Sequence, residues 1–174
     1  MDVLNQSTAK YFQITQDRTM ENRPKIDFVN TIANPKSLGD QANVLRMQTN
    51  TDTVYPDFLE KPLLLTSDKF KTVAKLYNPD YIYRSVVLTD KNKDEHKLYW
   101  NIEMPEIECV SPKSTYNHDG TLKNIVVDET ATKGKCLIRI KNRRWSIYII
   151  RLNMAESLLY RSLFGFNLAP LSHE

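Results

Sequence analysis

Residues 136–150, with the sequence CLIRIKNRRWSIYII, form the most regular stretch of the chain. Apolar side chains occupy every second position on each side of a polar pair, Asn142–Arg143, as is typical of two strands joined by a turn. The alternation predicts a hairpin with one buried face, made of Cys136, Ile138, Ile140, Trp145, Ile147 and Ile149. Tyr148 has the opposite parity, so we expect its ring to be exposed.

A short helix is expected after this hairpin. Asn153 is a favourable N-cap, Glu156 follows at the third helical position, and apolar residues continue at helical spacing to Leu163. Gly165 is placed to end the helix in the left-handed conformation. Residues 166–168 are expected to leave as an extended tail.

A second helix is expected before the hairpin, at about residues 68–77. Four apolar side chains there follow helical spacing, and Asn78-Pro79 ends the pattern, since proline disfavours helical geometry in the preceding residue. These side chains are Phe70, Val73, Ala74 and Tyr77.

Strands are expected between this helix and the hairpin. Residues 81–88 and 98–103 have strand composition and are separated by a polar connector, residues 89–97. Shorter extended pieces are expected at 107–110 and 125–127, with a turn at Asn117–Gly120 between them.

The first 55 residues are less regular. Residues 10–15 alternate as a strand would, and residues 17–25 are typical of a loop. Residues 27–32 fit either a helix or a strand. Ser37, with Asp40 three positions later, resembles a helix start.

Runs of strands with helices at their ends indicate an α+β fold rather than alternating α/β. We expect a single α+β domain over residues 1–174, with an antiparallel or mixed β-sheet built from hairpins and a few packed helices. Residues 1–55 would be its irregular N-terminal segment and residues 56–174 its core. A hydrophobic fraction of 41% in 174 residues is enough for such a core and excludes wholesale disorder.

The sequence carries no recognisable targeting or membrane signal. No apolar run approaches the roughly 20 residues of a spanning helix. The first residues lack the basic region and apolar core of a secretory signal. We therefore expect a cytoplasmic protein, with Cys109 and Cys136 as buried or half-buried thiols; a disulfide between them is the alternative.

The search for catalytic chemistry is mostly negative. The three histidines, His96, His118 and His173, have no histidine or cysteine at ligand spacing, and the four glycines cannot build a phosphate loop. His118-Asp119 is the one pair that could orient a catalytic imidazole, in a hydrolase or transferase with dispersed residues. We assign no catalytic, cofactor-binding or metal-binding residue and expect no cofactor and no enzymatic activity.

Two charged segments are candidate contact surfaces. The first is acidic: Glu103, Glu106 and Glu108, which resemble half of a metal or acid–base site but fit a solvated sheet edge better. The second belongs to residues 135–174, which carry seven basic and two acidic side chains. Its candidate residues are Arg139, Lys141, Arg143, Arg144, Tyr148 and Arg151.

Cations interleaved with rings are typical of single-stranded nucleic-acid binding. Trp145 is expected in the core, however, so only Tyr148 is left to stack, and no known RNA-binding motif accompanies it. The pattern therefore disfavours a nucleic-acid partner. A nucleic-acid-binding accessory domain that uses the basic hairpin, residues 135–151, is kept as the alternative function.

Several short motifs lie between Pro56 and Leu171. They are residues 56–59 (PDFL), 62–70 (PLLLTSDKF), 107–114 (IECVSPKS), 136–140 (CLIRI) and 165–171 (GFNLAPL). Together they resemble a bacterial domain family of immunity proteins from polymorphic toxin systems.

The resemblance implies a non-enzymatic cytoplasmic protein that binds one cognate toxin domain and blocks it by occlusion. A few buried anchors would supply affinity, and charge complementarity would speed association. Inhibitors of nucleases are commonly acidic, whereas this chain has a net charge of +3. The resemblance therefore points to a toxin with a neutral or acidic surface. It supplies no catalytic residues, and it does not indicate an oligomeric state.

Overall fold

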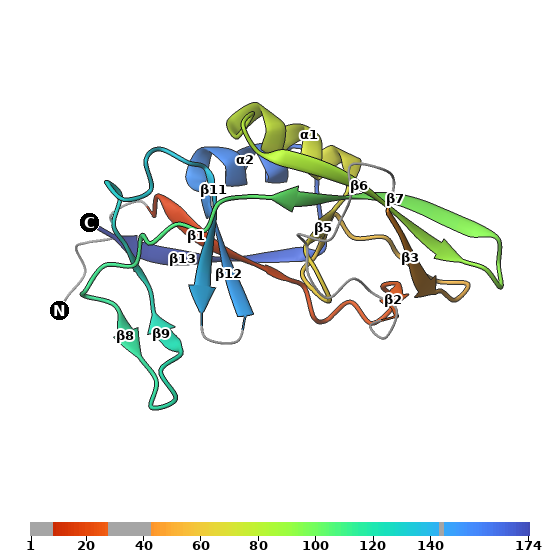
Figure 1. Ribbon diagram of the computed structural model, residues 1–174, viewed down its shortest axis with the longest axis horizontal. Coiled ribbons are helices and arrows are strands. Elements are labelled where there is room, and N and C mark those ends of the chain that lie inside the picture. The colour runs from red at the N-terminus through yellow and green to blue at the C-terminus, as the bar shows by residue number, and fades with distance from the viewer. Residues whose placement is uncertain (1–8, 28–42, 143–144) are drawn as a thin grey trace.

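The computed structural model describes residues 9–27, 43–142 and 145–174, which form an α+β fold dominated by strands (Figure 1). In chain order the elements are β1 (Tyr11–Gln16), β2 (Lys25–Ile26), β3 (Asn43–Gln48), β4 (Phe58–Leu59), β5 (Leu65–Thr66), α1 (Asp68–Tyr77), β6 (Ile82–Asp90), β7 (Glu95–Glu103), β8 (Thr115–Tyr116), β9 (Leu122–Asn124), β10 (Val126–Val127), β11 (Leu137–Asn142), β12 (Trp145–Arg151), α2 (Leu152–Tyr160) and β13 (Phe166–His173). The expected fold class, α+β with mixed sheets built from hairpins, is confirmed.

A five-stranded sheet, in the order β10-β13-β1-β12-β11, contains the predicted C-terminal hairpin. β11 and β12 pair antiparallel along their length, as the alternation predicts. The predicted N-terminal strand is also present, and it lies inside the sheet between β12 and β13. The tail expected at 166–168 is wrong, because β13 is an eight-residue strand whose backbone pairs with β1.

A six-stranded sheet, in the order β2-β3-β6-β7-β5-β4, is built around the β6–β7 hairpin. Both predicted strands of this hairpin exist, but the connector expected at 89–97 is wrong. Pairing continues to Asp90↔Glu95, so only residues 91–94 turn. The hydroxyl of Thr49 lies 2.9 Å from the Asp90 carboxylate and 3.0 Å from that of Glu95, which holds the strand ends together.

The two helices lie side by side on one side of the molecule (Figure 1) and cover the same core. α1 has its predicted position, and the Ser67 hydroxyl accepts the Phe70 amide at 3.1 Å as its N-cap. α2 begins at Leu152, so Asn153 is inside the helix and not its N-cap. The reason is that β12 runs directly into α2, with the Leu152 amide donating to the Lys10 carbonyl at 2.8 Å.

Gly165 does not end α2. The helix ends at Tyr160, and the left-handed residue that follows it is Ser162, with φ 55°. Gly165, with φ 88°, instead lies against Pro56: a Cβ built on it would be 2.2 Å from the Pro56 Cβ. Glycine is needed there for both the conformation and the close approach.

Three clusters of buried side chains form the core. The helix-side core packs the helices on the five-stranded sheet, and the back core covers the opposite face of that sheet. A third cluster lies under the six-stranded sheet. Central members are Ile14, Phe70, Leu137 and Leu158 in the helix-side core, Tyr11, Val127, Ile138 and Ile149 in the back core, and Leu45, Leu65, Leu88 and Tyr99 in the third cluster. The five-stranded sheet is therefore covered on both faces.

The segment between β7 and β11 is less regular than expected. No strand forms at 107–110, where single bridges join Glu106 to Arg139 and Val110 to Val127. The turn at 117–120 and the strand near 126 are present, as β8–β9 and β10. Residues 28–32 and the helix start expected at Ser37 lie outside the described residues, as do residues 143–144. The helix that would bring Leu38, Ala42 and Leu45 onto one face does not reach Leu45, because residues 43–48 form the strand β3.

Candidate functional site

The acidic candidates are partly neutralised by neighbouring arginines. The Glu103 carboxylate accepts a hydrogen bond from Arg84 Nε at 3.0 Å. Glu106 Oε2 lies 3.9 Å from Arg139 Nη2, so one residue of the acidic segment meets one of the basic hairpin. Glu108 is exposed. The two predicted surfaces thus come together at the outer edge of β11.

The basic candidates do not form one surface. Arg139 and Lys141 lie on the helix-side face of β11, opposite Tyr148 and Ser146 of β12. Arg151 lies at the other end of β12, with its guanidinium 6.0 Å from the Tyr11 ring centroid in the back core. Arg143 and Arg144 lie outside the described residues.

The two rings of this hairpin are placed opposite to expectation. Tyr148 is only 9% exposed, and its ring packs edge-on against Phe58 at 6.2 Å. Burial raises the pKa of its phenol. Trp145 is 47% exposed, because the back core that covers Ile147 and Ile149 stops short of the end of the strand. The ring available for stacking is therefore Trp145.

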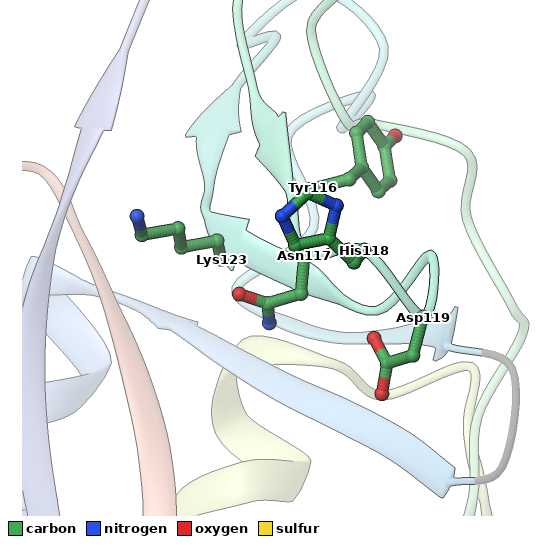
Figure 2. A pocket seen from close by; sticks show the side chains of 5 residues that line it. All are labelled: Tyr116, Asn117, His118, Asp119 and Lys123. Carbon is green, nitrogen blue, oxygen red and sulfur yellow. The ribbon is translucent and has the colours of Figure 1, made fainter.

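A pocket of about 480 Å³ lies on the β8–β9 hairpin and is lined by Tyr116, Asn117, His118, Asp119 and Lys123. Figure 2 shows Tyr116 and Lys123 on opposite sides of His118 and Asn117. The Asp119 carboxylate accepts the Thr121 amide at 2.9 Å and the Thr121 hydroxyl at 2.6 Å. Asp119 thus shapes the turn, and no serine, threonine or cysteine is among the five lining residues.

Each of the other two histidines has more than one neighbour: His96 Nε2 lies 3.5 Å from Asp94 Oδ1, and the His173 ring lies 6.1 Å from that of Tyr11. His96, near the tip of the β6–β7 hairpin, has Nδ1 3.2 Å from the Thr89 hydroxyl. His173 Nε2 lies 3.3 Å from Glu129, whose pKa is lowered chiefly by a hydrogen bond from Lys10. Within residues 9–27, 43–142 and 145–174, no three metal-ligating side chains gather at one place.

Cys109 and Cys136 are both buried and unbridged, as expected. Cys109 belongs to the back core and Cys136 to the helix-side core, so the sheet separates them. Burial raises the pKa of the Cys109 thiol to about 11. This thiol is therefore protonated and unreactive near neutral pH.

Three strongly exposed apolar side chains belong to the helices. Tyr160 is 88% exposed, Leu76 is 69% exposed and Leu159 is 56% exposed. The Tyr77 hydroxyl lies 2.6 Å from that of Ser157 across the helix pair. Leu76 and Tyr160 lie on the two helices that this contact joins, one position before Tyr77 and nearly one turn after Ser157. We call Leu76 and Tyr160, with the exposed residues around them, the helix face.

The helix face is not among the contact surfaces expected from the sequence. A signal exists in the run Leu158-Leu159-Tyr160, because a helix that buries one stripe cannot bury three consecutive apolar side chains. Leu158 is fully buried, and the next two side chains are left exposed.

Protein-family models and curated proteins were compared with this chain. No protein-family model matches it, and no curated protein matches it at the significance required. In the part of the chain that the structure describes, neither helix is long and apolar enough to cross a membrane.

Proposed function

We propose that this chain is a non-catalytic protein-binding domain that blocks a partner protein by covering part of its surface. The observation that carries the proposal is the helix face, where Leu76 and Tyr160 are held exposed on two packed helices. Such side chains on a preformed surface lose little conformational freedom on binding. Tyrosine is also among the residues enriched at the energetic centres of protein interfaces.

The charges around the helix face indicate the chemistry of the partner. Lys69 and Lys75 of α1 and Arg161, just after α2, are exposed, and so are two acids, Asp68 of α1 and Glu156 of α2, so these exposed cations outnumber the acids by three to two. A partner surface with an apolar pocket and an acidic rim would complement this arrangement. Rim charges of this kind mainly raise the association rate.

The family resemblance supports a bacterial toxin domain as the partner and the cytoplasm as the place of action. Two buried, unbridged thiols are consistent with a reducing compartment. The neutral or acidic toxin surface that the weakly basic chain implies agrees with the basic rim of the helix face.

The test is capture from the cells that produce the chain, followed by a protection assay. Three proteins are immobilised: the wild type, the helix-face variant Leu76→Ala/Tyr160→Ala, and the control Tyr116→Ala, whose exposed ring lies on the β8–β9 hairpin. One polypeptide should be retained by the wild type and the control but not by the helix-face variant. Expressed in a second host, it should inhibit growth, and the wild-type chain should restore growth.

The proposal fails if no polypeptide distinguishes the helix-face variant from the wild type. The alternative, nucleic-acid binding by the basic hairpin, loses Tyr148 as a stacking ring but keeps Trp145. It is weakened because Arg139 and Arg151 lie at separate places and do not form one basic surface. Nucleic acid retained at low salt and lost at high salt would favour that alternative, since phosphate contacts depend on counterion release.

A further inference from the structure

The pocket on the β8–β9 hairpin combines one exposed ring with several planar or charged polar groups. Tyr116 is 57% exposed, and the amide of Asn117, the imidazole of His118 and the ammonium of Lys123 surround the same space (Figure 2). Its volume of about 480 Å³ lies within the range of small-ligand sites, roughly 300–1,000 Å³.

Hydrogen bonds within the hairpin fix the side chains of Asn117 and Asp119. The Asn117 amide donates from Nδ2 to the Thr121 hydroxyl at 3.0 Å, and the same hydroxyl donates to Asp119. Thr121 is itself buried, at 7% exposed. The hairpin is also attached to the end of β11, because the Leu122 amide donates to Asn142 Oδ1 at 3.4 Å. A ligand would therefore meet a preorganised surface.

A second exposed ring lies on the same side of the sheet. Trp145 pairs with Asn142 and has the parity of Ile147 and Ile149, whose face is covered by the back core, with Leu122 packed against it. Two exposed rings on neighbouring hairpins, Tyr116 and Trp145, are thus available for stacking.

The charge of the pocket selects among ligands that stack on rings. Its one lysine is balanced by the Asp119 carboxylate, and none of its lining residues is an arginine. A ligand with several phosphates would be repelled by the Asp119 carboxylate, and Lys123 alone would offset this repulsion. A neutral sugar has an apolar C–H face that stacks on an aromatic ring and hydroxyl groups that bond to amide, imidazole and carboxylate side chains.

From this combination we propose that the β8–β9 pocket binds a neutral saccharide, with Tyr116 as the stacking ring. The site lies on a different element from the helix face and does not depend on the proposed protein-binding function.

The test is calorimetric titration of the full chain with four neutral hexasaccharides: cellohexaose, chitohexaose, xylohexaose and maltohexaose. At least one should bind with a Kd below about 1 mM. Tyr116→Ala should weaken that binding about 10-fold, whereas Tyr116→Phe and the helix-face control Tyr160→Ala should retain it. Lys123→Glu, which keeps the ring, should change the affinity for a neutral sugar less than about 3-fold.

Circular dichroism melting shows whether each variant is folded. If Tyr116→Ala does not fold, the binding of Tyr116→Phe still provides a test of the site. Absence of binding to all four hexasaccharides would overturn the proposal. Tighter binding of a (dT)12 oligonucleotide, lost in both Tyr116→Ala and Lys123→Glu, would assign the pocket to single-stranded nucleic acid and also overturn it.

Discussion

At the scale of single residues, Asp57 joins three segments that are distant in sequence. Its carboxylate accepts the Ser67 hydroxyl at the start of α1 and the Phe164 amide at 2.9 Å, beyond the end of α2. The Asp57 amide donates in return to the Phe164 carbonyl at 2.9 Å. This contact fixes the helix pair, and the close approach of Gly165 to Pro56 lies directly beside it.

Substitution of Gly165 by alanine should destabilise the fold more than the same change at Gly134. Both glycines have positive φ, 88° and 73°, so both substitutions strain the backbone by about 1–2 kcal/mol. Only at Gly165 would the new Cβ overlap Pro56, and overpacking adds about 1–3 kcal/mol. Urea unfolding of the two variants measures the difference, and equal losses would contradict the packing argument.

The rings of the C-terminal hairpin show what the sequence could and could not predict at this scale. The parity of Trp145 and Tyr148 was assigned correctly, but their exposure was not. Exposure depends on the two helices with the β4–β5 region, and on the segment before β11, which cover the two faces of the sheet from distant parts of the chain. Alternation within a strand indicates which side chains share a face, not whether a second layer covers the other face.

At the scale of elements, Asn78 connects α1 to β11. Its Nδ2 donates to the Ala74 carbonyl at 3.2 Å, and its Oδ1 accepts the amides of Cys136 and Leu137 at 3.2 and 3.3 Å. This fully buried amide therefore satisfies the end of a helix and the start of a strand together.

Asn78→Ala should lower the free energy of unfolding by about 2–3 kcal/mol, because two buried amides lose an acceptor. Hydrogen exchange should accelerate at Cys136 and Leu137 more than in the centre of β12. Asn124→Ala, at an exposed site on β9, is the matched control and should leave both quantities unchanged. Unchanged exchange at the two amides in Asn78→Ala would show that Asn78 does not hold β11.

The β6–β7 hairpin makes stability sensitive to acid. The Thr49 amide and hydroxyl lower the pKa of Asp90, and a hydrogen bond from Tyr55 with one from Thr49 lowers that of Glu95. A carboxyl whose pKa is lower in the folded than in the unfolded chain stabilises the fold above its unfolded pKa, and loses that contribution as pH falls through the folded pKa.

The free energy of unfolding should therefore be steady near neutral pH and fall as pH decreases below 4.5, the ordinary pKa of glutamate. Thr49→Val should show a shallower fall, because it removes one hydroxyl that favours both ionised carboxylates. Chemical unfolding at a series of pH values between 7 and 3 measures both slopes. A stability that rises on acidification would contradict this assignment.

At the scale of the whole molecule, the two sheets share the helix-side core. Phe58 and Leu64, from the β4–β5 region of one sheet, belong to the same cluster as Ile14 and Leu137 of the other. The sequence predicted both helices and the longer strands β1, β6, β7, β11 and β12, but not β13 or the sheet order, because each sheet pairs strands from distant parts of the chain.

Because the core is shared, the chain should unfold in one cooperative transition. Tryptophan fluorescence reports Trp100 in the six-stranded sheet and Trp145 in the five-stranded sheet, and far-ultraviolet circular dichroism reports all elements. The two urea curves should have the same midpoint. Separate midpoints would show that the sheets unfold independently.

The helix face shows why the proposed contact surface was not found from sequence. The candidates chosen from the sequence were charged segments. In the structure, Glu103 and Glu106 are paired with Arg84 and Arg139, and Tyr148 is buried. Leu76 and Tyr160 were not among the candidates, because helical spacing does not reveal how much of a helix its neighbours cover.

The central claim is that this chain binds a partner protein through the helix face, and the affinity for the captured partner tests it most directly. Calorimetry or surface plasmon resonance would compare the wild type, Leu76→Ala/Tyr160→Ala and the control Tyr116→Ala. Two anchors of about 2 kcal/mol each predict that the double variant binds at least about 100-fold more weakly, while the control stays within about 3-fold. Equal affinity of the folded double variant and the wild type would contradict the claim.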